Sequence, residues 1–139
     1  MGNKKNLADA ERQKRYMKKI ELAEERLNDV AALIPDFNDK IRRLACYKAF
    51  QEIVEALFDI IAMLLKDKGK LVEDDYANIG KLEEMGVIEE NDASVLKEAN
   101  GLRNRVIHKY NKTDDNTAKE SISNLMPNLE SILEKFRKR

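Results

Sequence analysis

Apolar residues recur at intervals of three and four along almost the whole chain, and this helical spacing restricts the fold more than any other feature of the sequence. The first seam runs from Tyr16 to Ile34, where Pro35 ends the helix and Asp36 is placed to cap the next one. Gly (5) and Pro (2) are scarce and no strand pattern is present, which disfavours sandwiches and barrels. We therefore expect an all-α, up-and-down bundle of about five helices.

The second expected helix, from about Phe37 to Lys68, carries two apolar seams that are offset by about 100° around its axis. One seam consists of Cys46, Ala49, Ile53, Ala56, Ile60 and Met63, and the other of Phe50, Val54, Leu57, Ile61 and Leu64. A helix that is apolar on two faces needs partners on two sides. One face can pack inside its own bundle, and the other is a candidate dimer interface. We expect a homodimer formed through this long helix and the fourth helix.

Three shorter helices are expected after Gly69. An acidic stretch, residues 73–92, contains a short helix with apolar positions at Tyr76, Ile79, Leu82 and Met85, closed by Gly86. Asn91 or Asp92 is placed to cap a fourth helix, whose apolar face is Val95, Ala99, Leu102 and Val106. Thr113 or Asp114 is placed to cap a fifth, with the seam Ile122, Leu125, Leu129, Ile132 and Phe136. Pro127 should kink this last helix or mark its restart.

The composition limits the classes of function. A length of 139 residues predicts one domain, residues 1–139, and 26 basic against 26 acidic residues give no global attraction to nucleic acid or membrane. The longest apolar run, residues 53–65, is too short to span a bilayer and contains two acidic residues. A single Cys, a single His and no export signal predict a cytoplasmic protein that has no disulfide, no zinc site and no cofactor.

The only histidine lies in a locally basic segment, residues 97–112, which reads Gly-Leu-Arg-Asn-Arg-Val-Ile-His-Lys-Tyr-Asn over residues 101–111. The bland interpretation is a solvated basic helix face with a surface histidine. However, Arg103, Asn104, His108 and Tyr110 together resemble the Arg-x4-His-x-Tyr signature of the HEPN superfamily in its HepT-like branch. The resemblance covers Phe37 to the C-terminus, and the motif lies near the end of the penultimate long helix, where the family has it.

This resemblance implies a small helical toxin that cleaves RNA without a metal ion and is paired with a minimal nucleotidyltransferase antitoxin. It implies Arg103 and His108 as catalytic residues and Asn104 and Tyr110 as supporting ones. The motif tyrosine is similar to the site at which the antitoxin attaches AMP, so Tyr110 is the expected acceptor. The competing hypothesis is a non-catalytic subunit that supports a nucleotidyltransferase and uses the same Arg/His/Tyr face to hold a nucleotide or the partner.

The chemistry of these residue types agrees with the resemblance, but their spacing on a helix raises the question of which arginine partners His108. RNA supplies its own nucleophile, the 2′-hydroxyl; His titrates near neutral pH, and Arg binds two phosphate oxygens at once. Because one His cannot easily serve as both base and acid, a dimer that brings two copies of His108 together would help. On an ideal helix Arg103 and His108 point about 140° apart, so spacing alone favours Arg105 as the partner of His108.

The acidic stripe Glu52, Glu55 and Asp59 on the second expected helix offers two interpretations. These carboxylates could orient Arg103 or His108 from the neighbouring helix, or they could form the solvated edge of the bundle. Glu55 and Asp59, four residues apart, would also be the ligands if cleavage did require magnesium. Cys46 lies in an apolar seam and is expected to be a small core residue.

Overall fold

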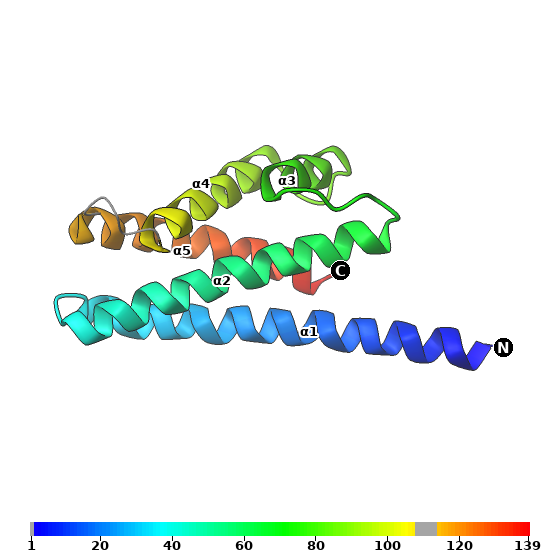
Figure 1. The fold of residues 1–139 in the computed structure, drawn as a ribbon, viewed down its shortest axis with the longest axis horizontal. Coiled ribbons are helices and arrows are strands. Elements are labelled where there is room, and N and C mark those ends of the chain that lie inside the picture. Colours follow the sequence, from blue (N-terminus) through cyan, green and yellow to red (C-terminus); the bar gives the residue numbers. More distant parts are fainter. Residues whose placement is uncertain (1, 108–113) are drawn as a thin grey trace.

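The computed structural model describes residues 2–107 and 114–139, and this part of the chain is an all-α bundle, as predicted (Figure 1). The helices are α1 (Gly2–Leu33), a 3-10 turn η1 (Ile34–Asp36), α2 (Lys40–Asp67), α3 (Asp75–Glu84), α4 (Glu90–Ile107) and α5 (Asp115–Arg137). Figure 1 shows α1 and α2 as a long antiparallel pair, with α3 and α4 on the other side of α2. Helix α5 contacts both α4 and α1, which closes the bundle.

Helices α1 and α2 are joined by an apolar seam and by a series of ion pairs along one edge. The predicted seam of α1 is buried, from Tyr16 to Val30. Three cations of α1, spaced seven residues apart, each bind a carboxylate of α2: Arg12 with Asp67 (3.1 Å), Lys19 with Asp59 (2.9 Å) and Arg26 with Glu52 (3.2 Å). We call this series the ion-pair ladder. Its spacing matches the heptad repeat of two helices that lie side by side.

Both apolar seams of α2 are buried within a single chain, which contradicts the predicted use of one of them as a dimer interface. Ile53 and Val54, one from each seam, are 0% and 1% exposed. Helix α1 covers one side of α2, while α3, α4 and α5 cover the other. The second seam therefore exists because the bundle surrounds α2, and its two-sided burial needs no second copy of the chain.

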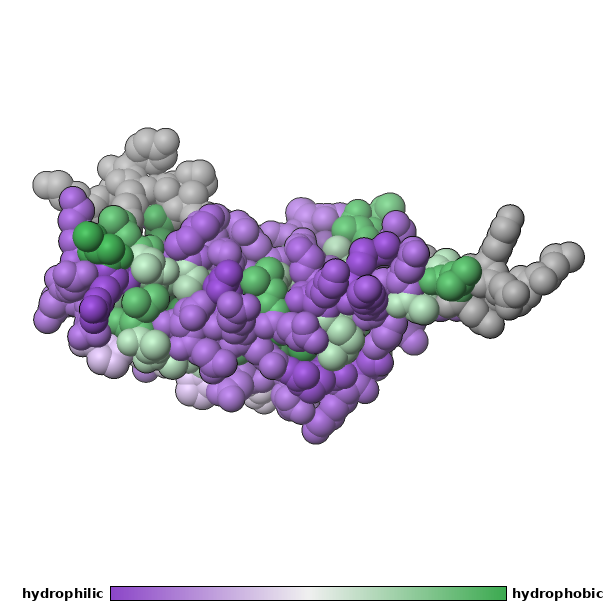
Figure 2. All heavy atoms as spheres, turned by 90° about the horizontal axis from the view of Figure 1, so that it is seen from below, coloured by the Kyte–Doolittle hydropathy of each residue, from purple (hydrophilic) through white to green (hydrophobic). Residues whose placement is uncertain are grey.

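Apolar side chains are exposed elsewhere on α2, near its first turn. Ile41 is 78% exposed and Leu44 is 45% exposed. Figure 2 shows apolar surface gathered at the corresponding end of the molecule, where α1 and α2 are joined. Nowhere in residues 2–107 and 114–139 is a helix both long and apolar enough to cross a membrane.

Two of the predicted helix starts are wrong by a few residues. Helix α2 is capped by Asp39 and not by Asp36, because a 3-10 turn carries the chain past Pro35; the Asp39 carboxylate accepts a hydrogen bond from the Arg42 N–H (2.9 Å). Helix α4 begins at Glu90, so Asp92 lies inside its first turn, where its carboxylate accepts from the Glu89 N–H (3.0 Å).

The remaining boundaries follow the sequence closely. Asp74 caps α3, which ends before Gly86, a glycine with φ of 73°. Asp114 caps α5, as predicted, by accepting from the Asn116 N–H (3.0 Å). Pro127 does not interrupt α5, which is one continuous helix, so of the two expectations, a kink or a restart, the restart is wrong.

Candidate functional site

Arg103 lies one turn before the end of α4 and points inward, toward α2 and α3. Its side chain is 18% exposed, whereas the next two residues, Asn104 and Arg105, are exposed. The helix places Arg103 next to the buried Leu102 on the inner side of α4. Arg103 is therefore the motif arginine whose guanidinium approaches α2 and α3. The choice between Arg103 and Arg105 as the partner of His108 stays a prediction, because His108 lies outside the described residues.

Asn100 holds the guanidinium of Arg103 from one turn earlier on the same helix. The Arg103 Nη2 donates to the Asn100 Oδ1 at 2.8 Å, and Asn100 itself is only 2% exposed. Residues three apart on a helix lie on the same side, which allows this contact. Sequence reasoning missed Asn100. The available signal was its position four residues after Leu96, on a face where an apolar residue is expected.

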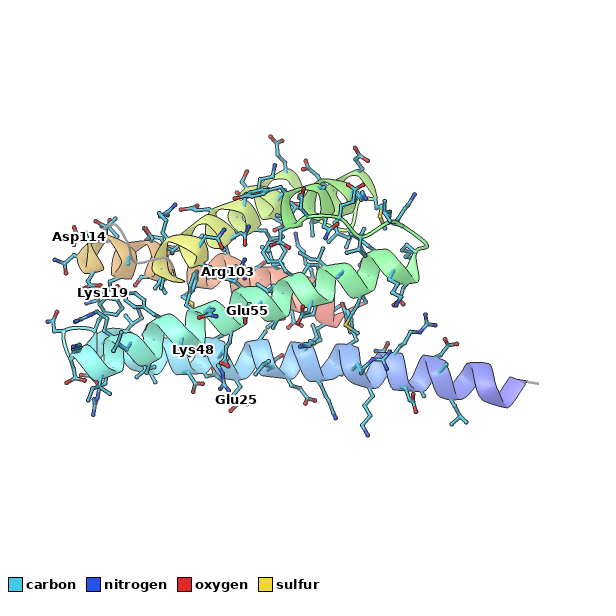
Figure 3. All side chains as sticks on the ribbon, viewed as in Figure 1. Glu25, Lys48, Glu55, Arg103, Asp114 and Lys119 are labelled. Carbon is cyan, nitrogen blue, oxygen red and sulfur yellow. The ribbon has the colours of Figure 1, made fainter. Side chains whose placement is uncertain are left out.

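Two carboxylates from two other helices flank the same guanidinium. Glu55 of α2 lies 3.8 Å from Nη1, and Asp75 of α3 lies 3.7 Å from Nη2. Figure 3 shows Arg103 and Glu55 next to each other where α4 passes α2. Glu55 therefore approaches Arg103 from the neighbouring helix, which was one of the two interpretations of the acidic stripe. Asp75 was interpreted only as part of the acidic stretch, since nothing in the sequence shows that α3 approaches α4 at this point.

The other two acids of the predicted stripe do not belong to this site. Glu52 and Asp59 bind Arg26 and Lys19 in the ion-pair ladder. Glu55 and Asp59, four residues apart on α2, thus contact different partners, Arg103 of α4 and Lys19 of α1. Among residues 2–107 and 114–139, no three His, Cys, Asp or Glu side chains are arranged to hold a metal ion.

One polar atom of Arg103 has no partner in the described part of the chain. Its Nε–H is buried and makes no hydrogen bond there. Leaving a buried donor unpaired costs about 1–3 kcal/mol, and more when the group is charged. Together with two carboxylates against one guanidinium, this makes the Arg103 site polar, partly desolvated and, over these three charges, net negative.

His108 and Tyr110 lie outside the described residues, so their predicted positions beside Arg103 stay predictions. The structure does describe what lies on either side of them. Val106 is buried before the segment, and after it Asp115 binds α2, accepting from the Tyr47 hydroxyl and pairing with Arg43 (3.3 Å). The chain on both sides is thus fixed to the bundle at the end where α4 passes α2.

The other tyrosines differ sharply in accessibility. Tyr16 is 5% exposed and donates to the Phe136 carbonyl, and Tyr47 is also 5% exposed. Burial raises the pKa of both phenols, to about 12 for Tyr16, and the carboxylate of Asp115 also raises that of Tyr47. Tyr76 is 50% exposed. Of the three described tyrosines, only Tyr76 is accessible to a modifying enzyme.

A separate hollow lies at the other end of the bundle. It encloses about 400 Å³ and is lined by Arg12, Tyr16, Leu64, Asp67 and Arg139, among others. The Arg12 side chain is already paired with Asp9 and Asp67. Two basic residues in the last turn of α5 are also paired within the fold, since Lys135 binds Asp92 and Arg137 binds Glu24. This end of the molecule is held by internal charge pairs.

The comparison that decides the family covers most of the chain. Residues 13–136 match the family model described as "Ribonuclease HepT-like". The chain belongs to the HepT-like ribonuclease family. Two proteins of Archaeoglobus fulgidus, each named as a candidate RNase, are similar to it in sequence. One is 42% identical over 114 residues, 82% of this chain and 85% of the relative, and the other 37% identical over 125 residues, 90% and 89%.

A solved structure confirms the fold of this HepT-like chain. The tri-AMPylated HEPN toxin of Shewanella oneidensis, in complex with MNT antitoxin, superimposes with a TM-score of 0.82. The match covers 89% of this chain and 97% of the toxin chain, at 16% sequence identity. At that identity the likeness shows the shared all-α HEPN architecture, which agrees with the fold predicted from the sequence.

Proposed function

We propose that this HepT-like chain is a metal-independent endoribonuclease of a toxin–antitoxin pair, with Arg103 and His108 as its catalytic residues. The observation that carries the proposal is the placement of Arg103. Within the described residues, the motif cation points inward at the end of α4, where it is partly desolvated and oriented by Asn100. A fixed guanidinium in a partly dry site is suited to stabilise charge that develops on a phosphate.

The proposed reaction uses the nucleophile that RNA carries. His108 removes the proton of a 2′-hydroxyl, whose oxygen attacks the adjacent phosphorus. The bond from phosphorus to the 5′-oxygen breaks, and that oxygen takes a proton from a general acid. The products are a 2′,3′-cyclic phosphate and a 5′-hydroxyl, so no water is consumed in this step. Positioned acid–base help of this kind contributes about 10²–10⁴-fold in rate.

The second proton carrier is supplied, in this proposal, by His108 of a second copy in a homodimer. Since both α2 seams are internal, the contact uses the outer surfaces of α2 and α4 at the end that carries Ile41, Leu44 and Asn104. The start of α2, which carries these exposed apolar side chains, lies at the same end of the bundle as the end of α4 (Figure 1). Asn104 supports the cleft from the exposed side of α4.

Control by a nucleotidyltransferase antitoxin is the third part of the proposal. The similar Shewanella oneidensis toxin is described as AMPylated and bound to MNT antitoxin. We expect Tyr110 to be the AMP acceptor here, because two described tyrosines are buried and only Tyr76 offers an exposed alternative. An added nucleotide beside His108 would block the cleft and repel RNA phosphates. The pair would act in the cytoplasm, where RNA is the substrate.

One observation favours the non-catalytic alternative. Glu55 and Asp75 give the Arg103 site more negative than positive charge, which disfavours phosphate and suits a basic partner surface. In that case the chain would be a helical subunit that holds a nucleotide or a nucleotidyltransferase partner. The two functions differ in whether purified protein cuts RNA.

The test is cleavage of total RNA by the purified chain in EDTA, compared with His108→Ala and Arg103→Ala. The proposal expects cleavage by the wild type and a loss of at least 10²-fold in each variant. Cleavage that EDTA abolishes and magnesium restores would refute metal independence, and no cleavage in either buffer would favour the binding subunit. Incubation with the partner, ATP and magnesium should add AMP to the wild type and to Tyr76→Phe but not to Tyr110→Phe.

A further inference from the structure

Asn100 occupies a position in α4 where the pattern of the helix expects an apolar side chain. It lies four residues after the buried Leu96 and directly after the buried Ala99, and only 2% of its surface is exposed. A buried amide is unfavourable unless its polar atoms are hydrogen-bonded. The partner that the structure gives to its Oδ1 is the Nη2 of Arg103, at 2.8 Å. The hydrogen bond to the motif arginine therefore compensates for the burial of the Asn100 oxygen.

The other contacts of Arg103 are too loose to set its direction. The Glu55 and Asp75 carboxylates lie 3.8 and 3.7 Å from the guanidinium nitrogens, beyond the distance of a good hydrogen bond. Both carboxylates are more than one-third exposed, so water screens them. Among the described residues, the hydrogen bond to Asn100 is the one directional contact of this guanidinium.

We propose that Asn100 is a positioning residue for the ribonuclease reaction: through its hydrogen bond to Nη2 it fixes the Arg103 guanidinium in the orientation that binds a phosphate oxygen of the RNA. This inference rests on the proposed function, because it assigns Asn100 a role only through Arg103. It also explains why a polar residue occupies a buried position at which an apolar residue would give a more stable fold. A leucine would suit the buried surroundings of residue 100, but it would leave Arg103 without the acceptor that orients it.

The kinetic test is a double-mutant cycle. Asn100→Leu should lower kcat about tenfold with a smaller change in KM, since the lost hydrogen bond is to a charged group. In the Arg103→Ala background the same substitution should cause no further loss, because Asn100 acts only through Arg103. Asn100→Asp keeps an oxygen acceptor for Arg103 but adds a third negative charge beside it, so it should retain more of kcat than Asn100→Leu and raise KM. Asn124→Leu, the same substitution at an exposed asparagine of α5, serves as the matched control and should cleave like the wild type.

A second readout follows Arg103 directly, without relying on catalysis. The Arg103 side-chain Nε–H resonance, assigned by comparison with Arg103→Ala, should be ordered in the wild type and lose order in Asn100→Leu. Thermal unfolding of Asn100→Leu and of the smaller Asn100→Ala should show that the fold is retained. An equal loss of kcat in both backgrounds, or an Arg103 signal that stays ordered in Asn100→Leu, would overturn the inference. By contrast, wild-type cleavage by Arg103→Ala would overturn the proposed function, whatever the resonance shows.

Discussion

Neutralising the two carboxylates beside Arg103 should strengthen the binding of RNA. In the double variant Glu55→Gln/Asp75→Asn the charge around the guanidinium changes from two negative against one positive to a single positive charge. If a phosphate binds on the open side of the guanidinium, it lies about 7 Å from each carboxylate, which at the dielectric constant of water gives a repulsion of about 0.6 kcal/mol each. The water value is appropriate because both carboxylates are more than one-third exposed.

This energy corresponds to about threefold in affinity per carboxylate and about sevenfold for the pair. The assay is the dissociation constant of a short RNA with a 2′-deoxy substitution at the cleaved position, measured from 0.05 to 0.5 M salt. The gain should shrink as salt rises, because the Debye length falls below the separation of the charges. The control is Asp9→Asn/Asp67→Asn, which removes the same charge beside Arg12 at the other end of the bundle. Weaker binding in the Glu55/Asp75 variant than in this control would refute the argument and show that the carboxylates hold Arg103 in place.

Three further changes test other parts of the structure. Ile41→Glu should convert the dimer to a monomer, measured by light scattering, with little change in the unfolding temperature, measured by calorimetry. Leu71→Glu, at a similarly exposed residue, should leave the mass in solution unchanged. A monomeric wild type would refute the shared cleft. Gly101→Ala should raise stability by about 0.8–1 kcal/mol, because the added Cβ meets no atom closer than 3.5 Å and alanine favours the helix; a loss of stability in chemical denaturation would contradict this. The raised pKa of Tyr16 contributes to the free energy of unfolding fully below pH 10, the ordinary pKa of the phenol, and this contribution is lost as pH rises toward the folded pKa of about 12. In Tyr16→Phe the free energy of unfolding, measured by chemical denaturation, should therefore fall less between pH 10 and pH 12 than in the wild type.

The helices were predictable because each seam lies on one face and each carries its own end signals. Gly86 and Asp114 terminate and cap the helices that the sequence assigns to them. The start of α2 was not predictable from local signals, since both Asp36 and Asp39 are suitable caps and the 3-10 turn after Leu33 decides between them. Local patterns identify helices better than they identify which of two adjacent caps is used.

The two seams of α2 illustrate a different limit. Their number correctly shows that α2 is covered on two sides, but periodicity does not reveal whether the cover comes from the same chain. At the candidate site, too, the sequence pattern was informative about individual residues but not about the packing between helices. The motif was found in the sequence, and the contact of Glu55 with Arg103 was one of two interpretations, whereas Asp75 depends on how α3 packs against α4. Asn100 gave a weak signal, a polar residue on an apolar face, whose meaning appears only when Arg103 is seen beside it.

The ion-pair ladder between α1 and α2 also affects which helices can pair between chains. All three of its cations lie on α1 and all three of its anions on α2, so two copies of α2 aligned along this edge would bring like charges together. For α1 the effect is weaker, because Arg12 and Arg26 also pair with acidic residues of α1 itself. The ladder therefore disfavours a contact between two α2 helices along this edge. The charges direct each α1 to an α2, and the short turn between them makes the α2 of its own chain the nearest one. A symmetric contact between two α2 helices is left to surfaces outside the ladder, such as the one around Ile41 and Leu44.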